Sequence, residues 1–188
     1  MNDHPVVFFD SGIGGLPYLL WFKNQMPGEN LAYCADTESF PYGKRPAGEV
    51  RALVLGFAER IIRRLDPKLA VVACNTASVS ALQELRDSFD IPFVGVVPAV
   101  KPAASLSKKK TIGIMATDRT VEEAYTEDLI RRFAGDCRII RYTDGDIIDF
   151  IENRFLDAKP WALDVFIRRA VKELKETDTV VLACTHYI

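Results

Sequence analysis

Short apolar runs alternate with amphipathic segments along the whole chain. The apolar runs are rich in Val, Ile, Leu and Phe on both faces, a composition typical of strands buried in a parallel sheet. They predict strands at residues 6–9, 31–35, 69–73, 93–97, 111–115, 138–142 and 179–183. Between them, apolar residues at three- and four-residue steps predict helices, most clearly at residues 48–65 and around Leu163 to Leu174.

Strands and helices in regular alternation predict an α/β fold, in which ligands bind beyond the carboxyl ends of the strands. The strand before Cys74 and the strand before Cys184 end in similar residues, and Asp10 and Thr117 follow two other strands at a similar spacing. This repetition favours two related α/β domains, residues 1–97 and 98–188, on either side of a cleft. Chance remains an alternative, because buried strands draw on few residue types.

Composition narrows the classes of function. The 24 basic and 26 acidic residues leave a net charge of -2, which gives no bulk positive field for nucleic acid or anionic lipid. The three lysines at residues 108–110 are expected to form a solvated turn. No apolar run approaches the roughly 20 residues that cross a bilayer, and residues 1–5 lack a positively charged region ahead of a long apolar stretch. We therefore expect no nucleic-acid or membrane partner and a cytoplasmic protein.

Four cysteines are scattered singly, without the C-x-x-C spacing of a zinc or redox site. Cys74 and Cys184 each follow a strand and precede hydroxyl and amide donors at a predicted helix start, a setting that lowers the pKa of a thiol. Two such thiols on opposite faces of one carbon would invert it by taking and giving a proton. Cys34 and Cys137 lack polar neighbours in the sequence and are expected to be structural.

The segment Asp10-Ser11-Gly12-Ile13-Gly14-Gly15 lies between a strand and a helix. Its glycines allow close backbone approach, and helix N–H groups there could bind an anion. The dinucleotide fingerprint fails because Pro17 occupies the position of its last glycine or alanine. Asp10 favours a ligand that also carries an ammonium group. The alternative is a structural turn in which Asp10 and Ser11 cap the helix.

Two further residues could take part in chemistry. His186 follows Cys184 by two positions and is interpreted as a ligand or base, the alternative being a hydrogen-bonded helix-start residue. Glu152 lies at the border of an apolar helix face, where its pKa could be raised, although a surface ion pair is the common role of such a residue. A zinc site formed by Cys74, Cys184 and His186 is a third alternative.

Five motifs occur in one order along the chain: Asp10-Ser11-Gly12-Ile13-Gly14-Gly15, Pro41-Tyr42-Gly43, Cys74-Asn75-Thr76-Ala77-Ser78, Gly95-Val96-Val97-Pro98-Ala99 and Cys184-Thr185-His186-Tyr187. With them the chain resembles the glutamate racemases of the cofactor-independent aspartate/glutamate racemase superfamily. The resemblance implies two Rossmann-like or flavodoxin-like parallel-sheet domains related by pseudo-symmetry, with the active site in the cleft between them. It also implies conversion of L-glutamate to D-glutamate for peptidoglycan biosynthesis, and hence for the cell wall and cell shape, without cofactor or metal. A homodimer is one assembly that it allows.

The resemblance assigns roles to individual residues. Cys74 and Cys184 match the two catalytic cysteines, Asp10 matches the carboxylate beside the first, and Glu152 and His186 match the pair that assists the second. The residues that match substrate contacts are Asp10, Ser11, Pro41, Tyr42, Gly43, Cys74, Asn75, Thr76, Thr117, Thr120, Cys184, Thr185 and His186.

Some positions depart from the family pattern. Alanine replaces the usual glycine at Ala35, Ala116 and Ala183, and residues 144–151 lack the Pro-rich approach to Glu152. Members of the family continue past the position of Ile188, so the C-terminal part of the family fold is expected to be missing from these 188 residues. The alternatives left open are a racemase of aspartate or another amino acid, and a truncated, non-catalytic amino-acid-binding homologue.

Overall fold

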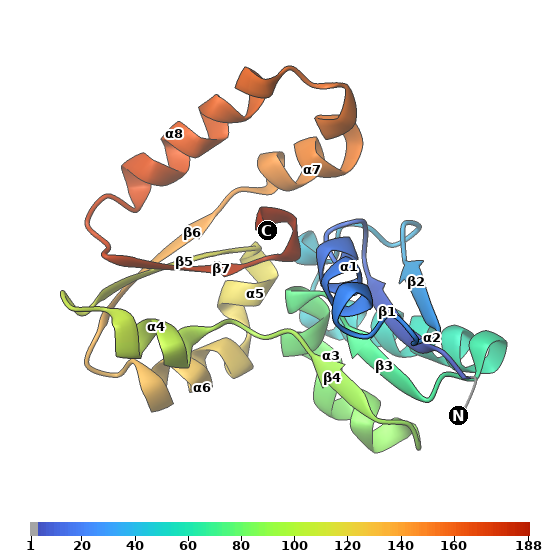
Figure 1. Ribbon diagram of the computed structural model, residues 1–188. Helices are drawn as coiled ribbons and strands as arrows, with labels where there is room; N and C mark the ends of the chain where they lie inside the picture. The colour runs from blue at the N-terminus through green and yellow to red at the C-terminus, as the bar shows by residue number, and fades with distance from the viewer. Residues whose placement is uncertain (1–3) are drawn as a thin grey trace.

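The computed structural model describes residues 4–188, whose strands form two separate parallel sheets (Figure 1). The first has the order β2-β1-β3-β4, and the second has the order β6-β5-β7. Their strands are β1 (Val6–Asp10), β2 (Leu31–Ala35), β3 (Leu69–Val72), β4 (Phe93–Gly95), β5 (Thr111–Ala116), β6 (Arg138–Thr143) and β7 (Thr179–Ala183). The predicted α/β class with two parallel sheets is confirmed.

The two sheets repeat one arrangement of strands. In each, the first strand in sequence lies between the second and the third, and every pairing is parallel. Cys74 follows β3 and Cys184 follows β7, so the two thiols end equivalent strands. The first sheet uses residues up to Gly95 and the second begins at Thr111; the domain division between residues 97 and 98 stays a prediction.

The seven predicted strands agree with the observed ones to within two residues at each end. Residues 93–97 form a shorter strand than predicted, since β4 ends at Gly95. The segment 138–142 is an edge strand with exposed or half-buried residues, and the expectation that it is buried on both faces was wrong.

Helices connect the strands and cover the sheets. They are α1 (Leu16–Gln25), α2 (Ala47–Leu65), α3 (Asn75–Ser88), α4 (Val100–Leu106), α5 (Asp118–Glu122), α6 (Ala124–Phe133), α7 (Gly145–Arg154) and α8 (Asp164–Glu173), with 3-10 turns η1 (Tyr42–Lys44), η2 (Phe155–Asp157), η3 (Pro160–Leu163) and η4 (Thr185–Tyr187). The predicted helix 48–65 is α2. Within residues 4–188 no helix has the length and apolar character needed to span a membrane.

The second predicted helix, around Leu163 to Leu174, is divided between η3 and α8. Phe166 packs inward, but Ile167 and Val171 are exposed to 52% and 63%. The apolar positions of this segment therefore do not all face the core, as their spacing predicted.

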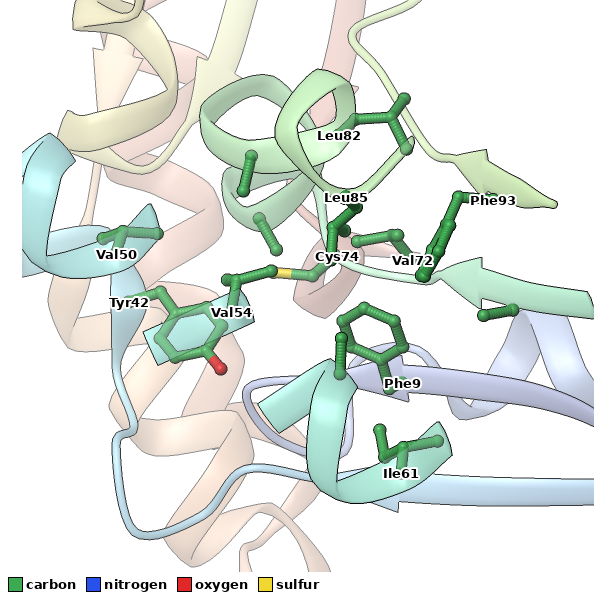
Figure 2. Close-up of a cluster of buried hydrophobic side chains, with 14 of the residues drawn as sticks. Phe9, Tyr42, Val50, Val54, Ile61, Val72, Cys74, Leu82, Leu85 and Phe93 are labelled. Carbon is green, nitrogen blue, oxygen red and sulfur yellow. The ribbon is translucent and has the colours of Figure 1, made fainter. Parts of the chain in front are cut away.

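The main core of the first half lies between its sheet and helices α2 and α3. Figure 2 shows Cys74 in this core, with the aromatic ring of Tyr42 and the side chain of Val54 nearby. Tyr42 is fully buried, and its hydroxyl donates to Asp36 Oδ2 at 2.7 Å. Close packing of this kind holds side chains in fixed positions. It sets both Cys74 and the turn that contains Tyr42 firmly against the first sheet.

Helices α3 and α5 join the two halves through buried polar contacts. Ser80 Oγ on α3 donates to Glu123 Oε1 at 2.9 Å, and Arg119 Nε lies 3.3 Å from the same oxygen. One turn nearer the N-terminus of α3, the hydroxyl of Thr76 lies 3.1 Å from that of Thr120. These two contacts fix helix α3, which begins directly after Cys74, against the second half of the chain.

Candidate active site

A cavity of about 300 Å³ lies where the carboxyl ends of the two sheets face each other. The side chains that line it come from the loop after β1, from η1 and the start of α3, and from α5, α7 and η4. They include the predicted site residues Asp10, Ser11, Pro41, Tyr42, Gly43, Cys74, Asn75, Thr76, Thr117, Cys184, Thr185 and His186. Thr120 and Glu152 do not line the cavity but contact residues that do.

The residues around Cys74 form one acid–base group. Asp10, at the end of β1, is fully buried, and its two carboxylate oxygens accept from Ser11 N–H at 2.6 Å and from the Thr185 hydroxyl at 3.1 Å. Burial raises the pKa of Asp10 despite these bonds. Burial, and then the charge of Asp10, raises the pKa of Cys74 well above its ordinary value. The predicted lowering at the start of α3 is therefore wrong, because loss of solvent outweighs the effect of the helix end.

The residues around Cys184 form a second acid–base group, in which the partner of the thiol is a histidine rather than a carboxylate. The Cys184 sulfur lies 3.8 Å from His186 Nδ1, and His186 Nε2 lies 2.7 Å from Glu152 Oε2. Burial acts to lower the pKa of His186, but its hydrogen bonds to Cys184 and Glu152 raise that pKa to about 10. An imidazolium next to a sulfur stabilises negative charge on it.

Glu152 differs from its sequence prediction in two ways. Its side chain is only 10% exposed, so it forms an internal ion pair rather than a surface one. Burial acts to raise the pKa of Glu152, but hydrogen bonds from His186 and from the N–H of Ile13 lower it below the ordinary value. The predicted rise of this pKa was wrong because helix periodicity shows an apolar neighbour on the same helix but not a cation from another element.

The His186–Glu152 pair should stabilise the fold in a limited pH range. Its raised pKa means that the His186 contribution is complete below the ordinary value of 6.5 and is lost as the pH rises towards about 10. The lowered pKa of Glu152 means that its contribution is present above 4.5 and is lost in acid. Glu152→Gln should therefore lower the free energy of unfolding most between pH 4.5 and 6.5, by about 1–3 kcal/mol.

Urea unfolding at a series of pH values would measure this difference. Glu127→Gln is the matched control, because Glu127 pairs with Arg141 in solvent, where a salt bridge contributes about 1 kcal/mol or less. A difference between Glu152→Gln and the unmodified protein that stays constant from pH 6 to pH 10 would contradict the assignment of the proton to His186.

The glycine-rich loop after β1 binds an anion that belongs to the protein itself. The N–H of Ile13 lies 3.1 Å from each carboxylate oxygen of Glu152. A Cβ on Gly12 would lie 2.4 Å from the same carboxylate, and a Cβ on Gly14 would lie 2.6 Å from Thr185 Oγ1. None of the described glycines has a positive φ. Glycine at positions 12 and 14 therefore provides room for the second half to approach, rather than an unusual backbone conformation.

The alternative that Asp10 and Ser11 cap the helix is wrong. Helix α1 has Gly15 at its N-cap, without any side-chain cap. Tyr33 holds the loop instead, because its hydroxyl donates to the carbonyl oxygen of Gly12 at 2.7 Å and accepts from Gly15 N–H at 3.1 Å.

Three threonine hydroxyls form a triangle beside the cavity. The Oγ1 atoms of Thr76, Thr117 and Thr120 lie 2.9 to 3.1 Å from one another. Thr76 comes from the first half of the chain, and the other two come from the second half. Each hydroxyl can both donate and accept, so Thr76 and Thr117, which line the cavity, can turn donors towards a carboxylate bound there.

Sequence reasoning missed seven of the residues that line the cavity: Phe40, Lys44, Asp118, Gly145, Ile148, Asp149 and Asn153. Several lie on α7 at helical spacing around Glu152, and extending that helix face from Glu152 would have found them. Lys44 directly follows Pro41-Tyr42-Gly43. Its position next to a predicted substrate loop could have indicated that it lines the cavity.

The zinc alternative has no support in the part of the chain that the structure describes. Residues 4–188 contain no group of three or more His, Cys, Asp and Glu side chains placed to hold a metal ion. Cys74 and Cys184 instead interact with separate partners, Asp10 and His186.

Comparison with known proteins gives consistent matches over nearly the whole chain. The family model described as Asp/Glu/Hydantoin racemase matches residues 24–187. The chain is 41% identical to the glutamate racemase of Sphingopyxis alaskensis over 191 residues, covering 98% of this chain and 70% of that protein. It is 38% identical to the glutamate racemase of Sodalis glossinidius, covering 97% of this chain and 63% of that protein.

Solved structures agree. Escherichia coli glutamate racemase, in complex with L-glutamate and the activator UDP-MurNAc-Ala, superposes with a TM-score of 0.87 at 38% identity, covering 98% of this chain and 70% of that one. Aquifex pyrophilus glutamate racemase gives 0.75 at 29% identity, covering 97% and 71%. An aspartate racemase homologue from Pyrococcus horikoshii, at 12% identity and a TM-score of 0.58 with 97% and 86% coverage, shares the fold.

Proposed function

The chain belongs to the Asp/Glu/Hydantoin racemase family, and on this premise we propose that it interconverts L-glutamate and D-glutamate by proton transfer between two thiols. The observation that carries the proposal is the pair Cys74 and Cys184, which line one cavity from equivalent strand ends, each with its own acid–base partner. Similarity to glutamate racemases at 38% to 41% identity supports the choice of glutamate.

In the proposed reaction the α-carbon of glutamate lies between the two sulfurs. One cysteine thiolate removes the α-proton, and the electron pair of the broken C–H bond remains on the carbon and its carboxylate. The other cysteine gives its S–H proton to the opposite face and becomes the thiolate. Each proton lost is replaced, so the reaction needs no oxidant, cofactor or metal.

The two thiols have different acid–base partners, and in this proposal they take different roles. The raised pKa of Cys74 keeps its proton in place, which makes Cys74 the proton donor at rest. His186 Nδ1 lies 3.8 Å from the Cys184 sulfur and can exchange a proton with it, and we assign Cys184 the role of the base. For the opposite enantiomer the roles reverse: Asp10, whose pKa is raised, accepts the Cys74 proton, and His186 gives a proton to the Cys184 sulfur, so that Cys74 is the base and Cys184 the donor.

The substrate carboxylates would bind at three turns that meet around the cavity. Backbone N–H groups at the start of a helix bind anions well, and the starts of α3 and η1 both contribute residues to the cavity wall. The hydroxyls of Thr76 and Thr117 and the amide of Asn75 add side-chain donors, and Thr185, whose hydroxyl donates to Asp10, also lines the cavity. Ser11, Pro41, Tyr42 and Gly43 complete the wall, and Asp10 can accept from the substrate ammonium.

Incubation with L-glutamate in deuterated water tests the proposal. The purified protein should replace the α-hydrogen by deuterium and form D-glutamate without an added cofactor, as followed by NMR and chiral chromatography. Faster exchange of aspartate would favour the aspartate alternative. Calorimetric binding of glutamate without any exchange would favour the non-catalytic homologue. The absence of both binding and exchange would refute the proposal.

The cellular setting follows from the proposed chemistry. D-Glutamate supplied to peptidoglycan synthesis would give the enzyme its role in cell-wall formation and cell shape. A thiol can act as acid or base only while reduced, which the cytoplasm maintains. A homodimer stays a prediction, to be tested by light scattering.

A further inference from the structure

Lys44 lies at the mouth of the cavity and reaches from one half of the molecule to the other. It ends the turn η1 in the first half and lines the cavity. Its Cε lies 2.9 Å, and its Nζ 3.4 Å, from the position that a Cβ would take on Gly145, the first residue of α7 in the second half. The side chain of Lys44, which is exposed to solvent, therefore rests on the backbone of α7 beside the cavity.

The Lys44 ammonium differs in charge or in pairing from the other ionisable groups that line the cavity. Asp10, Asp118 and Asp149 are acidic, and the positive charge of His186 is already paired with Glu152. Among residues 4–188, the Lys44 ammonium makes no hydrogen bond or ion pair. It is the one lysine or arginine among the lining residues, and it is free to bind an anionic group of a ligand.

We propose that Lys44 selects a dicarboxylate substrate by binding its distal carboxylate, an inference that rests on the proposed function. The α-carbon of the substrate must lie between Cys74 and Cys184, so its side chain extends away from them along the cavity. An ammonium–carboxylate hydrogen bond is shorter and stronger than a neutral one. Glutamine has the shape of glutamate but lacks this charge, and Lys44 therefore discriminates between the two.

The charge acts equally on the bound substrate and on the transition state, because the distal carboxylate takes no part in proton transfer. Loss of such uniform binding raises KM and leaves kcat unchanged. Methionine has a stem of similar length to lysine, so Lys44→Met keeps the packing on Gly145 and removes the charge. Arginine keeps the charge, so Lys44→Arg should restore most of the affinity.

Steady-state racemisation by the full chain tests the proposal. For Lys44→Met we expect KM for glutamate to rise about tenfold, with kcat within about twofold. Glutamine, measured as an inhibitor, should bind to Lys44→Met as tightly as it binds to the unmodified protein. The preference of the protein for glutamate over glutamine should therefore fall in Lys44→Met. Lys109→Met is the control, since Lys109 lies in a surface turn outside the cavity, and its kinetics should be unchanged.

An unchanged KM in Lys44→Met, a fall in kcat alone, or failure of Lys44→Arg to restore KM would each overturn the proposal. If the unmodified protein does not racemise glutamate, the proposed function fails separately, and calorimetric titration with glutamate then decides the role of Lys44. Weaker binding by Lys44→Met than by Lys109→Met supports it. Equal binding, or no binding by any form, overturns it.

Discussion

Replacing Cys74 or Cys184 by serine should lower racemisation by about a thousandfold or more, since a positioned acid or base contributes about 10²–10⁴. Serine keeps the size of the side chain and its ability to hydrogen-bond, but a hydroxyl is a far weaker acid than a thiol. Each variant still has one working thiol. Cys74→Ser should therefore exchange the α-hydrogen of one enantiomer with solvent without inverting it, and Cys184→Ser should do so for the other.

NMR detection of exchange, together with chiral chromatography of the product, separates the two effects. Cys34→Ser and Cys137→Ser are the matched controls, because neither thiol lines the cavity and Cys137 lies beside Asp136 near the surface. Both controls should retain full activity. Inversion by Cys74→Ser or Cys184→Ser within tenfold of the unmodified protein would refute the two-thiol mechanism.

Gly14→Ala should lower activity about a hundredfold, the scale of loss that a misplacement of about 1 Å causes. The added Cβ would lie 2.6 Å from Thr185 Oγ1 and 2.7 Å from His186 Nδ1. Both atoms belong to η4, which follows Cys184 directly, so relief of the clash moves η4 away from Asp10 and displaces Cys184. Overpacking of this kind costs about 1–3 kcal/mol of stability.

Gly48→Ala is the control for this substitution. Gly48 lies in helix α2, and a Cβ there would meet no atom within 4 Å apart from its chain neighbours and the backbone of its own helix. Alanine in a helix is about 0.5–1 kcal/mol more favourable than glycine, so this variant should be active and equally or more stable in urea. Full activity of Gly14→Ala would show that η4 can move without loss of catalytic geometry.

The fold was predictable because its signal is local. Buried parallel strands require several consecutive apolar residues, and the run from Val6 to Phe9 or from Thr179 to Ala183 satisfies that requirement within the segment itself. The positions of Cys74 and Cys184 follow, because a residue directly after a parallel strand lies at the ligand-binding edge of its sheet. Their shared cavity could thus be expected from strand ends alone.

The parts of the site that could not be predicted depend on distant residues. Glu152 was placed correctly on a helix, but its bond to the N–H of Ile13 crosses between the two halves. The same contact shows that the glycine-rich loop binds the carboxylate of Glu152, whereas the sequence predicted that this loop would bind a ligand. The pKa of Cys74 was predicted in the wrong direction because burial and the charge of Asp10 arise from tertiary packing.

The unequal partners of the two thiols have a thermodynamic consequence. In water, L- and D-glutamate have the same free energy, so their equilibrium mixture contains equal amounts of both, and kcat/KM must be the same in the two directions. Asp10 beside Cys74 and His186 beside Cys184 can therefore make kcat differ between enantiomers only if KM differs by the same factor. In the proposed mechanism the asymmetry between the halves can therefore give the two enantiomers different KM values, and it leaves the composition at equilibrium unchanged.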